Sequence, residues 1–248
     1  MAKPVPPRAF VAPAVQHLIV RYAKRGKMRF ASHRDVARAF ERGVRRAGLP
    51  IAYSAGFTPH PKISYAGGAP TGVASEAEYL TLGMTSSQGA DLVRERLNAV
   101  LPDGIDVIDV TEETPGRPAG VLEASEWRVL LPGVGPEAAE RAVAGFLARA
   151  DAPVERRTDK GVRQLDARSA VVEMSVLAGA DGDRRVAVTS TQDCAILRMV
   201  VLHMAPAVRP DDVLAVLGAE HGIAPSSPSL ITRLAQGQRD ALTGTATS

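Results

Sequence analysis

The chain is nearly free of cysteine, with Cys194 the only one among 248 residues. One thiol forms no internal disulfide, and it cannot supply the multiple cysteine ligands of zinc or iron–sulfur sites. The sequence also lacks a Gly-rich phosphate loop, a zinc-binding motif and a Ser/His/Asp signature. We therefore expect no metal and no cofactor, and the cysteine usage suits a cytoplasmic protein.

Long apolar runs are also absent. No segment approaches the roughly 20 apolar residues that a membrane-spanning helix requires, and residues 1–13 lack the apolar core of a secretory signal. The hydrophobic content of 45% and the charged content of 23% are ordinary for a globular protein. A chain of this length can bury one large core or two small ones.

The charge is unevenly distributed along the sequence. Residues 1–62 contain 13 Lys and Arg against the two acids Asp35 and Glu41, a net charge of +11, whereas the remaining residues carry −8. Such a concentration of positive charge indicates a polyanionic partner, most often nucleic acid.

The pattern of elements in the first half predicts a ferredoxin-like lobe over residues 15–112, preceded by a disordered segment at 1–14. Residues 15–30 favour a strand, and Ser32 to Asp35 has the spacing of a capping box before a helix that ends near Ala47, with Gly48 beyond it. A short extended piece at 51–54, strands at 62–67 and 76–84, a helix at 88–100 and a strand at 105–110 follow. The order is β-α-β-β-α-β with one additional extended piece.

A second α+β cycle is predicted over residues 121–222, and residues 223–248 are expected to be a flexible tail. Strands are expected at 126–131, 154–157, 164–166, 171–177 and 185–189, and helices at 136–150 and 209–217. The fold class is therefore α+β, with two ferredoxin-like sandwich lobes in tandem.

The first predicted helix has one basic face and one apolar face. At 100° per residue, five arginines lie within about 120° of one another, and the apolar side chains occupy the opposite side. The preceding basic residues can extend this patch. The predicted RNA-binding residues are Arg34, Arg38, Arg42, Arg45, Arg46, Lys24, Arg25 and Lys27.

A second candidate surface is the segment around Pro59-His60-Pro61. The prolines restrict the backbone and present His60 from a stiff loop, so His60 is a candidate acid–base or RNA-contacting group. Glu76 and Glu78, two residues apart on a strand, are either a carboxylate pair or a solvated strand face. The predicted recognition loop comprises Tyr53, Ser54, Gly56, Phe57, Pro59, His60, Pro61, Lys62, Ser64 and Glu78.

A third motif, Arg157-Thr-Asp-Lys-Gly-Val162, has two interpretations. It resembles the stretch around the catalytic aspartate of the tRNA pseudouridine synthases that act on the anticodon stem-loop, and that resemblance implies Asp159 as a nucleophile. Arg163 stands where that family has histidine. Alternatively, Asp159-Lys160-Gly161 is the tip of a hairpin.

A longer set of residues runs from Ser32-His-Arg-Asp35 through Arg45-Arg46-Ala47 and Gly56-Phe57-x-Pro59-His60-Pro61 to Gly72-x-x-Ser75-x-x-Glu78-Tyr79. It resembles the radical SAM-linked family, a domain of unknown function. The resemblance implies a protein fused to, or encoded beside, a radical S-adenosylmethionine enzyme. One cysteine cannot ligate the iron–sulfur cluster of such an enzyme, so the resemblance implies the companion and not the enzyme.

The sequence thus predicts an accessory protein that binds RNA or a ribonucleoprotein and presents substrate to a radical SAM enzyme. Two alternatives remain open: an RNA-modifying enzyme of pseudouridine-synthase type that uses Asp159, and a protein–protein adaptor whose basic face meets an acidic partner.

Overall fold

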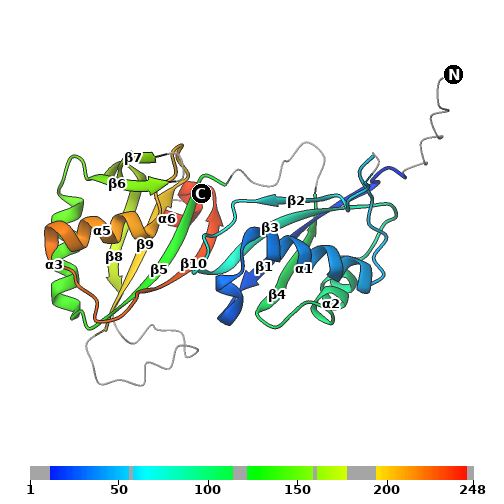
Figure 1. Ribbon diagram of the computed structural model, residues 1–248, viewed down its shortest axis with the longest axis horizontal. Coiled ribbons are helices and arrows are strands. Elements are labelled where there is room, and N and C mark those ends of the chain that lie inside the picture. The colour runs from blue at the N-terminus through cyan, green and yellow to red at the C-terminus, as the bar shows by residue number, and fades with distance from the viewer. Residues whose placement is uncertain (1–11, 56–57, 114–121, 159–160, 178–193, 245–248) are drawn as a thin grey trace. The chain divides into compact units, whose positions relative to one another are not determined.

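The computed structural model describes residues 12–55, 58–113, 122–158, 161–177 and 194–244. The chain divides into two compact units, Met1–Ala119 and Gly120–Ser248, and most of their elements are labelled in Figure 1. Residues 1–11, within the segment predicted to be disordered, lie outside the described residues.

The first unit has the predicted β-α-β-β-α-β order. Its sheet is antiparallel throughout, with strand order β4-β1-β3-β2, which is the ferredoxin-like arrangement. A short 3-10 helix, η1, stands between the first strand and the first helix. The elements are β1 (Gln16–Lys24), η1 (Gly26–Phe30), α1 (His33–Arg46), β2 (Ile63–Ala66), β3 (Ala74–Met84), α2 (Ala90–Asn98) and β4 (Ile105–Glu112).

The core of this unit lies between the two helices and one face of the sheet. Alternate residues of β1 point into it, namely Leu18, Val20 and Tyr22, as the two-residue period of a strand requires. The fully buried Phe40 of α1 packs edge-on against the Tyr22 ring, with 4.7 Å between the ring centroids. This packing fixes which face of α1 is turned away from the core.

The second unit repeats the same topology with an insertion. Its antiparallel sheet has the order β10-β5-β9-β8, and the hairpin β6–β7 is inserted between α3 and β8. The elements are β5 (Ala124–Pro132), α3 (Pro136–Leu147), β6 (Pro153–Thr158), β7 (Gly161–Asp166), α4 (Ala167–Ala170), β8 (Val171–Leu177), β9 (Cys194–Leu202), α5 (Pro210–His221), β10 (Leu230–Gly237) and α6 (Arg239–Thr243). Two ferredoxin-like units in tandem are therefore confirmed.

Three expectations for the second unit need correction or fall outside the described residues. The predicted flexible tail, 223–248, is wrong over β10 and α6, because β10 pairs with β5 in an antiparallel ladder and α6 is a helix. Helix α5 continues past Gly218 and ends at Gly222, which has φ +68°. The strand expected at 185–189 lies outside the described residues, while β9, for which no strand range was predicted, pairs with both β5 and β8.

Within the described ranges, no helix combines the length and the apolar character needed to cross a lipid bilayer.

Candidate nucleic-acid interface

Helix α1 begins at the predicted capping box. The Ser32 hydroxyl accepts a hydrogen bond from the Asp35 amide at 3.2 Å, and the Asp35 carboxylate accepts one from the Ser32 amide at 3.1 Å. Hydrogen bonds from Ser32 lower the pKa of Asp35, with smaller contributions from Arg38 and Arg34. The helix ends at Ala47, and Gly48 follows with φ +61°. Both ends therefore form as the local sequence predicts.

The two faces of α1 are also as predicted. Val36, Ala39, Phe40, Gly43 and Val44 are buried against the sheet. The five arginines on the other side are exposed: Arg34, Arg38, Arg42, Arg45 and Arg46. We call these five residues the arginine face. Because the helix rises about 1.5 Å per residue, Arg34 and Arg45 are separated by roughly 16 Å along its axis.

None of the five residues of the arginine face forms an ion pair within the part of the chain that the structure describes. The nearest acid in sequence, Asp35, is committed to the helix cap. Glu41 is half-buried on the same helix, and its charge contributes to the raised pKa of Tyr65. The face therefore carries five arginines against one exposed acid, Asp35, whose carboxylate is hydrogen-bonded in the helix cap.

Two of the residues expected to extend this face have structural roles instead. Lys24 is only 3% exposed, and its ammonium donates to the carbonyls of Ala69 and Pro70, each at 3.3 Å. It therefore holds down the loop between β2 and β3, and the prediction that it contacts RNA is wrong. Lys27, in η1, is exposed and remains a candidate.

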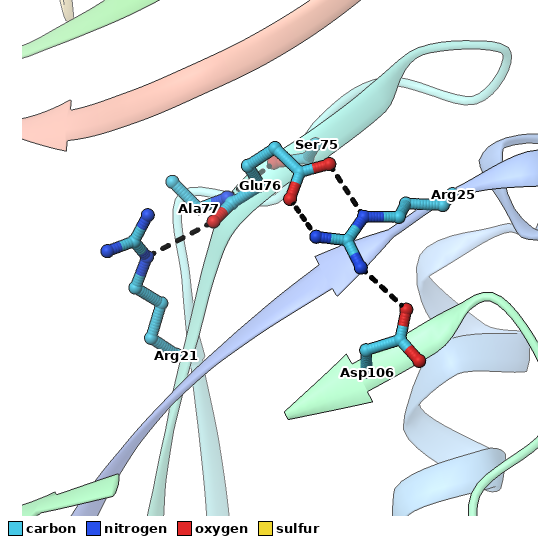
Figure 2. Close-up of polar contacts among 6 residues, drawn as sticks. All are labelled: Arg21, Arg25, Ser75, Glu76, Ala77 and Asp106. Carbon is cyan, nitrogen blue, oxygen red and sulfur yellow. Dashed lines mark hydrogen bonds and ion pairs between the residues drawn. The ribbon is translucent and has the colours of Figure 1, made fainter. Parts of the chain in front are cut away.

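The prediction that Arg25 contacts RNA also needs correction. Its guanidinium lies between two carboxylates at the end of β1 (Figure 2). It pairs with both carboxylate oxygens of Glu76, with Nε to Oε1 at 2.7 Å, and donates to Asp106 at 2.9 Å. The hydrogen bond with Glu76 is the main reason that the pKa of Arg25 is raised. Because β1 lies between β3 and β4 in the sheet, Arg25 joins three strands and is not free to bind phosphate.

The two carboxylates of β3 are not a catalytic pair. Glu76 is engaged by Arg25, and its backbone carbonyl accepts a hydrogen bond from Arg21 at 3.1 Å (Figure 2). Glu78 is 3% exposed and accepts a hydrogen bond from the Ala69 amide at 3.1 Å. The assignment of Glu78 to an exposed recognition loop is therefore wrong: it anchors the same β2–β3 loop that Lys24 holds.

The Pro59-His60-Pro61 segment is an exposed loop with a closed base. The Ser54 amide donates to the His60 carbonyl at 2.8 Å, the His60 amide donates to the Ser54 hydroxyl at 3.0 Å, and Tyr53 forms an isolated bridge with Pro61. Pro59, His60, Lys62 and Ser64 are exposed, Tyr53 and Ser54 are half-buried and Pro61 is buried. Gly56 and Phe57, also predicted for this loop, lie outside the described residues.

No catalytic partner for His60 is present in the described ranges, where nothing hydrogen-bonds its imidazole. The ring is therefore available for contact but not oriented for proton transfer. No three His, Cys, Asp or Glu side chains of the described part of the chain are grouped to hold a metal ion.

Asp159 and Lys160 lie outside the described residues, so Asp159 remains a prediction. Strands β6 and β7 on either side of them pair in register from Pro153–Asp166 to Thr158–Gly161, and Gly161 has φ +109°. A partly buried ion pair joins this hairpin to α5: Arg156 donates to both carboxylate oxygens of Asp212, at 3.1 and 2.6 Å.

Two aromatic residues beside α1 were not among the predicted site residues. Phe30, in η1, is 59% exposed and was expected at the end of a strand. The Tyr65 hydroxyl is buried without a hydrogen-bond partner among the described residues, its pKa is raised by burial, and its ring meets that of His33 at 5.0 Å. The exposure of Phe30 could have been predicted from its position, because it lies two residues before the helix cap and outside the apolar period of α1.

The family assignment follows from a match over residues 17–210 with a family described as "Uncharacterized protein conserved in bacteria (DUF2344)". The chain belongs to this family. The match covers most of both units, including the capping box, the arginine face and the Pro59-His60-Pro61 loop. It assigns no activity, and it carries no statement about a radical SAM enzyme.

No curated protein matches the chain. Among solved structures, the chain is similar to one from a Cbf5-Nop10-Gar1 complex, with 13% identity, a TM-score of 0.48, and coverage of 95% of this chain and 55% of that one. It thus spans about half the length of that protein. The first two RRM domains of the yeast poly(U)-binding protein Pub1 match with 14% identity, a TM-score of 0.24 and coverage of 88% and 98%. A dye-decolorizing protein from V. cholerae matches with 9% identity, a TM-score of 0.20 and coverage of 90% and 92%.

Proposed function

We propose that this protein binds RNA, free or within a ribonucleoprotein, through the arginine face of α1. The observation that carries the proposal is the exposure of five arginines on one side of a single 14-residue helix, without an ion pair among the described residues. Arginine presents its donors in a planar fork that matches phosphate oxygens, and it stays charged at any physiological pH.

The acid nearest to the arginine face in sequence supports this proposal, because its carboxylate already has another partner. Asp35 is held in the helix cap, and Glu76 and Asp106 are held by Arg25. A carboxylate that formed ion pairs with these arginines would neutralise part of the surface. A row of unneutralised arginines instead releases counterions from a polyanion, which favours binding and makes it dependent on salt. Lys27 and the exposed Pro59-His60-Pro61 loop are proposed as additional contacts.

The proposed role is that of an accessory protein. The resemblance in the sequence implies a radical SAM enzyme as partner, and a module that binds RNA is suited to present substrate to it. With Cys194 alone, the chain has too few thiolates to ligate an iron–sulfur cluster itself.

The test is direct binding of tRNA and ribosomal RNA fragments, measured by filter retention or fluorescence anisotropy. The variant carries Arg38→Glu, Arg42→Glu and Arg45→Glu. A matched control carries the same charge change at Arg96→Glu, Arg141→Glu and Arg163→Glu, which are exposed and unpaired in the described structure. We expect the first variant to lose RNA binding and the control to retain most of it.

Three results would contradict the proposal or favour an alternative. Equal losses in both variants mean that binding follows total charge and not this face. Absence of RNA binding by the unaltered protein, together with capture of a single acidic protein that survives nuclease treatment, favours the adaptor function instead. Pseudouridine formation that disappears in Asp159→Ala favours the enzyme.

A further inference from the structure

Phe30 is an aromatic side chain in an unusual place. The chain contains few aromatics, five Phe, four Tyr and one Trp. Among those that the structure describes, Tyr22, Phe40, Trp127 and Phe146 are buried, and Tyr53, Tyr65 and Tyr79 are half-buried. Phe30 is 59% exposed, and it lies just before the first turn of the arginine-faced helix.

The backbone that carries Phe30 is firmly held. In η1, the Met28 amide donates to the Arg25 carbonyl at 3.0 Å, and the Ala31 amide donates to the Met28 carbonyl at 3.0 Å. The Gly72 amide donates to the Arg29 carbonyl at 2.8 Å, so the β2–β3 loop is fastened to the same turn. Met28 packs against the core of the first unit. The exposed ring is therefore displayed from a fixed position and not from a loose loop.

One face of the ring is already occupied by a cation. The guanidinium carbon of Arg29 lies 4.6 Å from the Phe30 ring centroid, which is the geometry of a cation–π contact. The ring edge and the opposite face must account for the large exposed area. Lys27 and Arg34, both exposed, lie three and four residues away along the chain, and four residues of even fully extended chain span only about 14 Å.

We propose that Phe30 is a stacking platform for an unpaired base, so that the RNA bound by this protein is single-stranded at this point. This inference rests on the proposed function, because the arginine face supplies the phosphate contacts. Exposed aromatics beside basic side chains bind single strands in this way, since every base has a π-face that stacks on the ring. Bases within a duplex are stacked on one another and are not available to a flat side chain.

The decisive experiment compares Phe30→Ala, Phe30→Leu and Phe30→Tyr in binding to two probes. The first probe is a single-stranded oligoadenylate that carries one fluorescent 2-aminopurine base, and the second is a duplex RNA with the same number of phosphates. For the single strand, Phe30→Ala is expected to weaken binding roughly 5- to 150-fold, the range reported by alanine substitution at a stacking residue. Phe30→Leu is expected to weaken binding nearly as much, because leucine keeps the apolar surface but has no π-face. Phe30→Tyr keeps the π-face and should retain binding.

Fluorescence and salt dependence separate stacking from charge. Stacking quenches 2-aminopurine, so quenching should occur with the unaltered protein and with Phe30→Tyr, and be lost with Phe30→Ala. The slope of log affinity against log salt should stay constant in all three variants, because no phosphate contact is removed. Binding to the duplex should not change.

The results distinguish this inference from the proposed function. If the single strand binds and the arginine variant abolishes binding, but Phe30→Ala has no effect, the stacking platform is wrong and the arginine face stands. If Phe30→Leu binds as well as the unaltered protein, the ring makes an apolar contact and not a stack, and the inference is again wrong. If neither probe binds the unaltered protein, both fail together.

Discussion

The closest backbone approach near the site occurs at Gly104, and it gives the sharpest prediction about the fold. Gly104 has φ +89°, and a Cβ atom added there would lie 2.7 Å from the Arg25 carbonyl oxygen. The Arg25 amide donates to the Gly104 carbonyl at 2.8 Å. This contact sets the end of β1, from which Arg25 reaches Glu76 and Asp106. We predict that Gly104→Ala destabilises the first unit strongly.

The magnitude follows from comparison with Gly72, which has almost the same backbone angle, φ +92°, but no atom within 4 Å of an added Cβ. Gly72→Ala should therefore cost only the left-handed backbone conformation, about 1–2 kcal/mol. Gly104→Ala carries that cost and also the contact with a carbonyl that is not free to move, about 1–3 kcal/mol more. The expected total of about 2–5 kcal/mol is a large part of the 5–15 kcal/mol that stabilises a typical domain.

The distribution of aromatics allows each unit to be followed separately in urea. All four tyrosines, Tyr22, Tyr53, Tyr65 and Tyr79, belong to the first unit, and Trp127 belongs to the second. We expect the tyrosine fluorescence of Gly104→Ala to change at a lower urea concentration than that of Gly72→Ala. The midpoint of the tryptophan transition should be unchanged in both variants. Equal shifts in the two variants would refute the close approach, and a shift of the tryptophan transition alone would refute the assignment to the first unit.

Three further predictions concern charge. Five phosphate contacts on a single strand give a slope of log affinity against log salt of about −3.5, so affinity should fall about 130-fold between 50 and 200 mM salt. The triple variant Arg38→Gln, Arg42→Gln and Arg45→Gln should reduce the slope to about −1.4 and the fall to about 7-fold. An unchanged slope would exclude these arginines from the contact with RNA. Lys24→Met should cost about 1.5–3 kcal/mol of stability, because two carbonyls lose a charged donor. It should not change the salt dependence of RNA binding. A changed salt slope would show that Lys24 contacts RNA after all. Burial, and to a lesser extent Arg233, lowers the pKa of His203 from 6.5, so folding favours the neutral ring, and the second unit should lose stability as the pH falls below about 6.5. Urea unfolding followed by Trp127 fluorescence at about pH 8 and about pH 5.5 measures this loss of stability. The loss should be smaller in His203→Gln. An equal loss in that variant would assign the pH effect to other groups.

The hydrogen-bond partners of His203 could not be predicted from the sequence around it. Its two ring nitrogens lie 2.7 Å from the Ser125 hydroxyl and 2.7 Å from the Leu122 carbonyl. Both partners are about 80 residues away in sequence, and no spacing rule connects them. The same is true of Arg25, whose partners Glu76 and Asp106 come from two other strands. Sequence alone counted Arg25 as an exposed cation because its own neighbours are basic.

The features that local sequence determined are those that depend on contacts within about one helical turn. The capping box at Ser32 and Asp35, the glycine after α1 and the separation of its arginines from its apolar residues were all predictable, because helix geometry alone places side chains three and four residues apart on one face. The β-α-β-β-α-β order of the first unit was predictable for the same reason, since each element carries its own period.

What only the tertiary structure decided is which charges remain free. Strand pairing brings Lys24 under the β2–β3 loop and Arg25 between two carboxylates, so two predicted RNA contacts become structural supports. Phe30, shortly before α1 in the chain, stays exposed. Pairing also incorporates β10 into the second sheet, although the serine- and proline-rich sequence before it reads as a tail. The composition thus determined the positive charge of this region, and the folding of distant strands onto one another decided which part of that charge faces solvent.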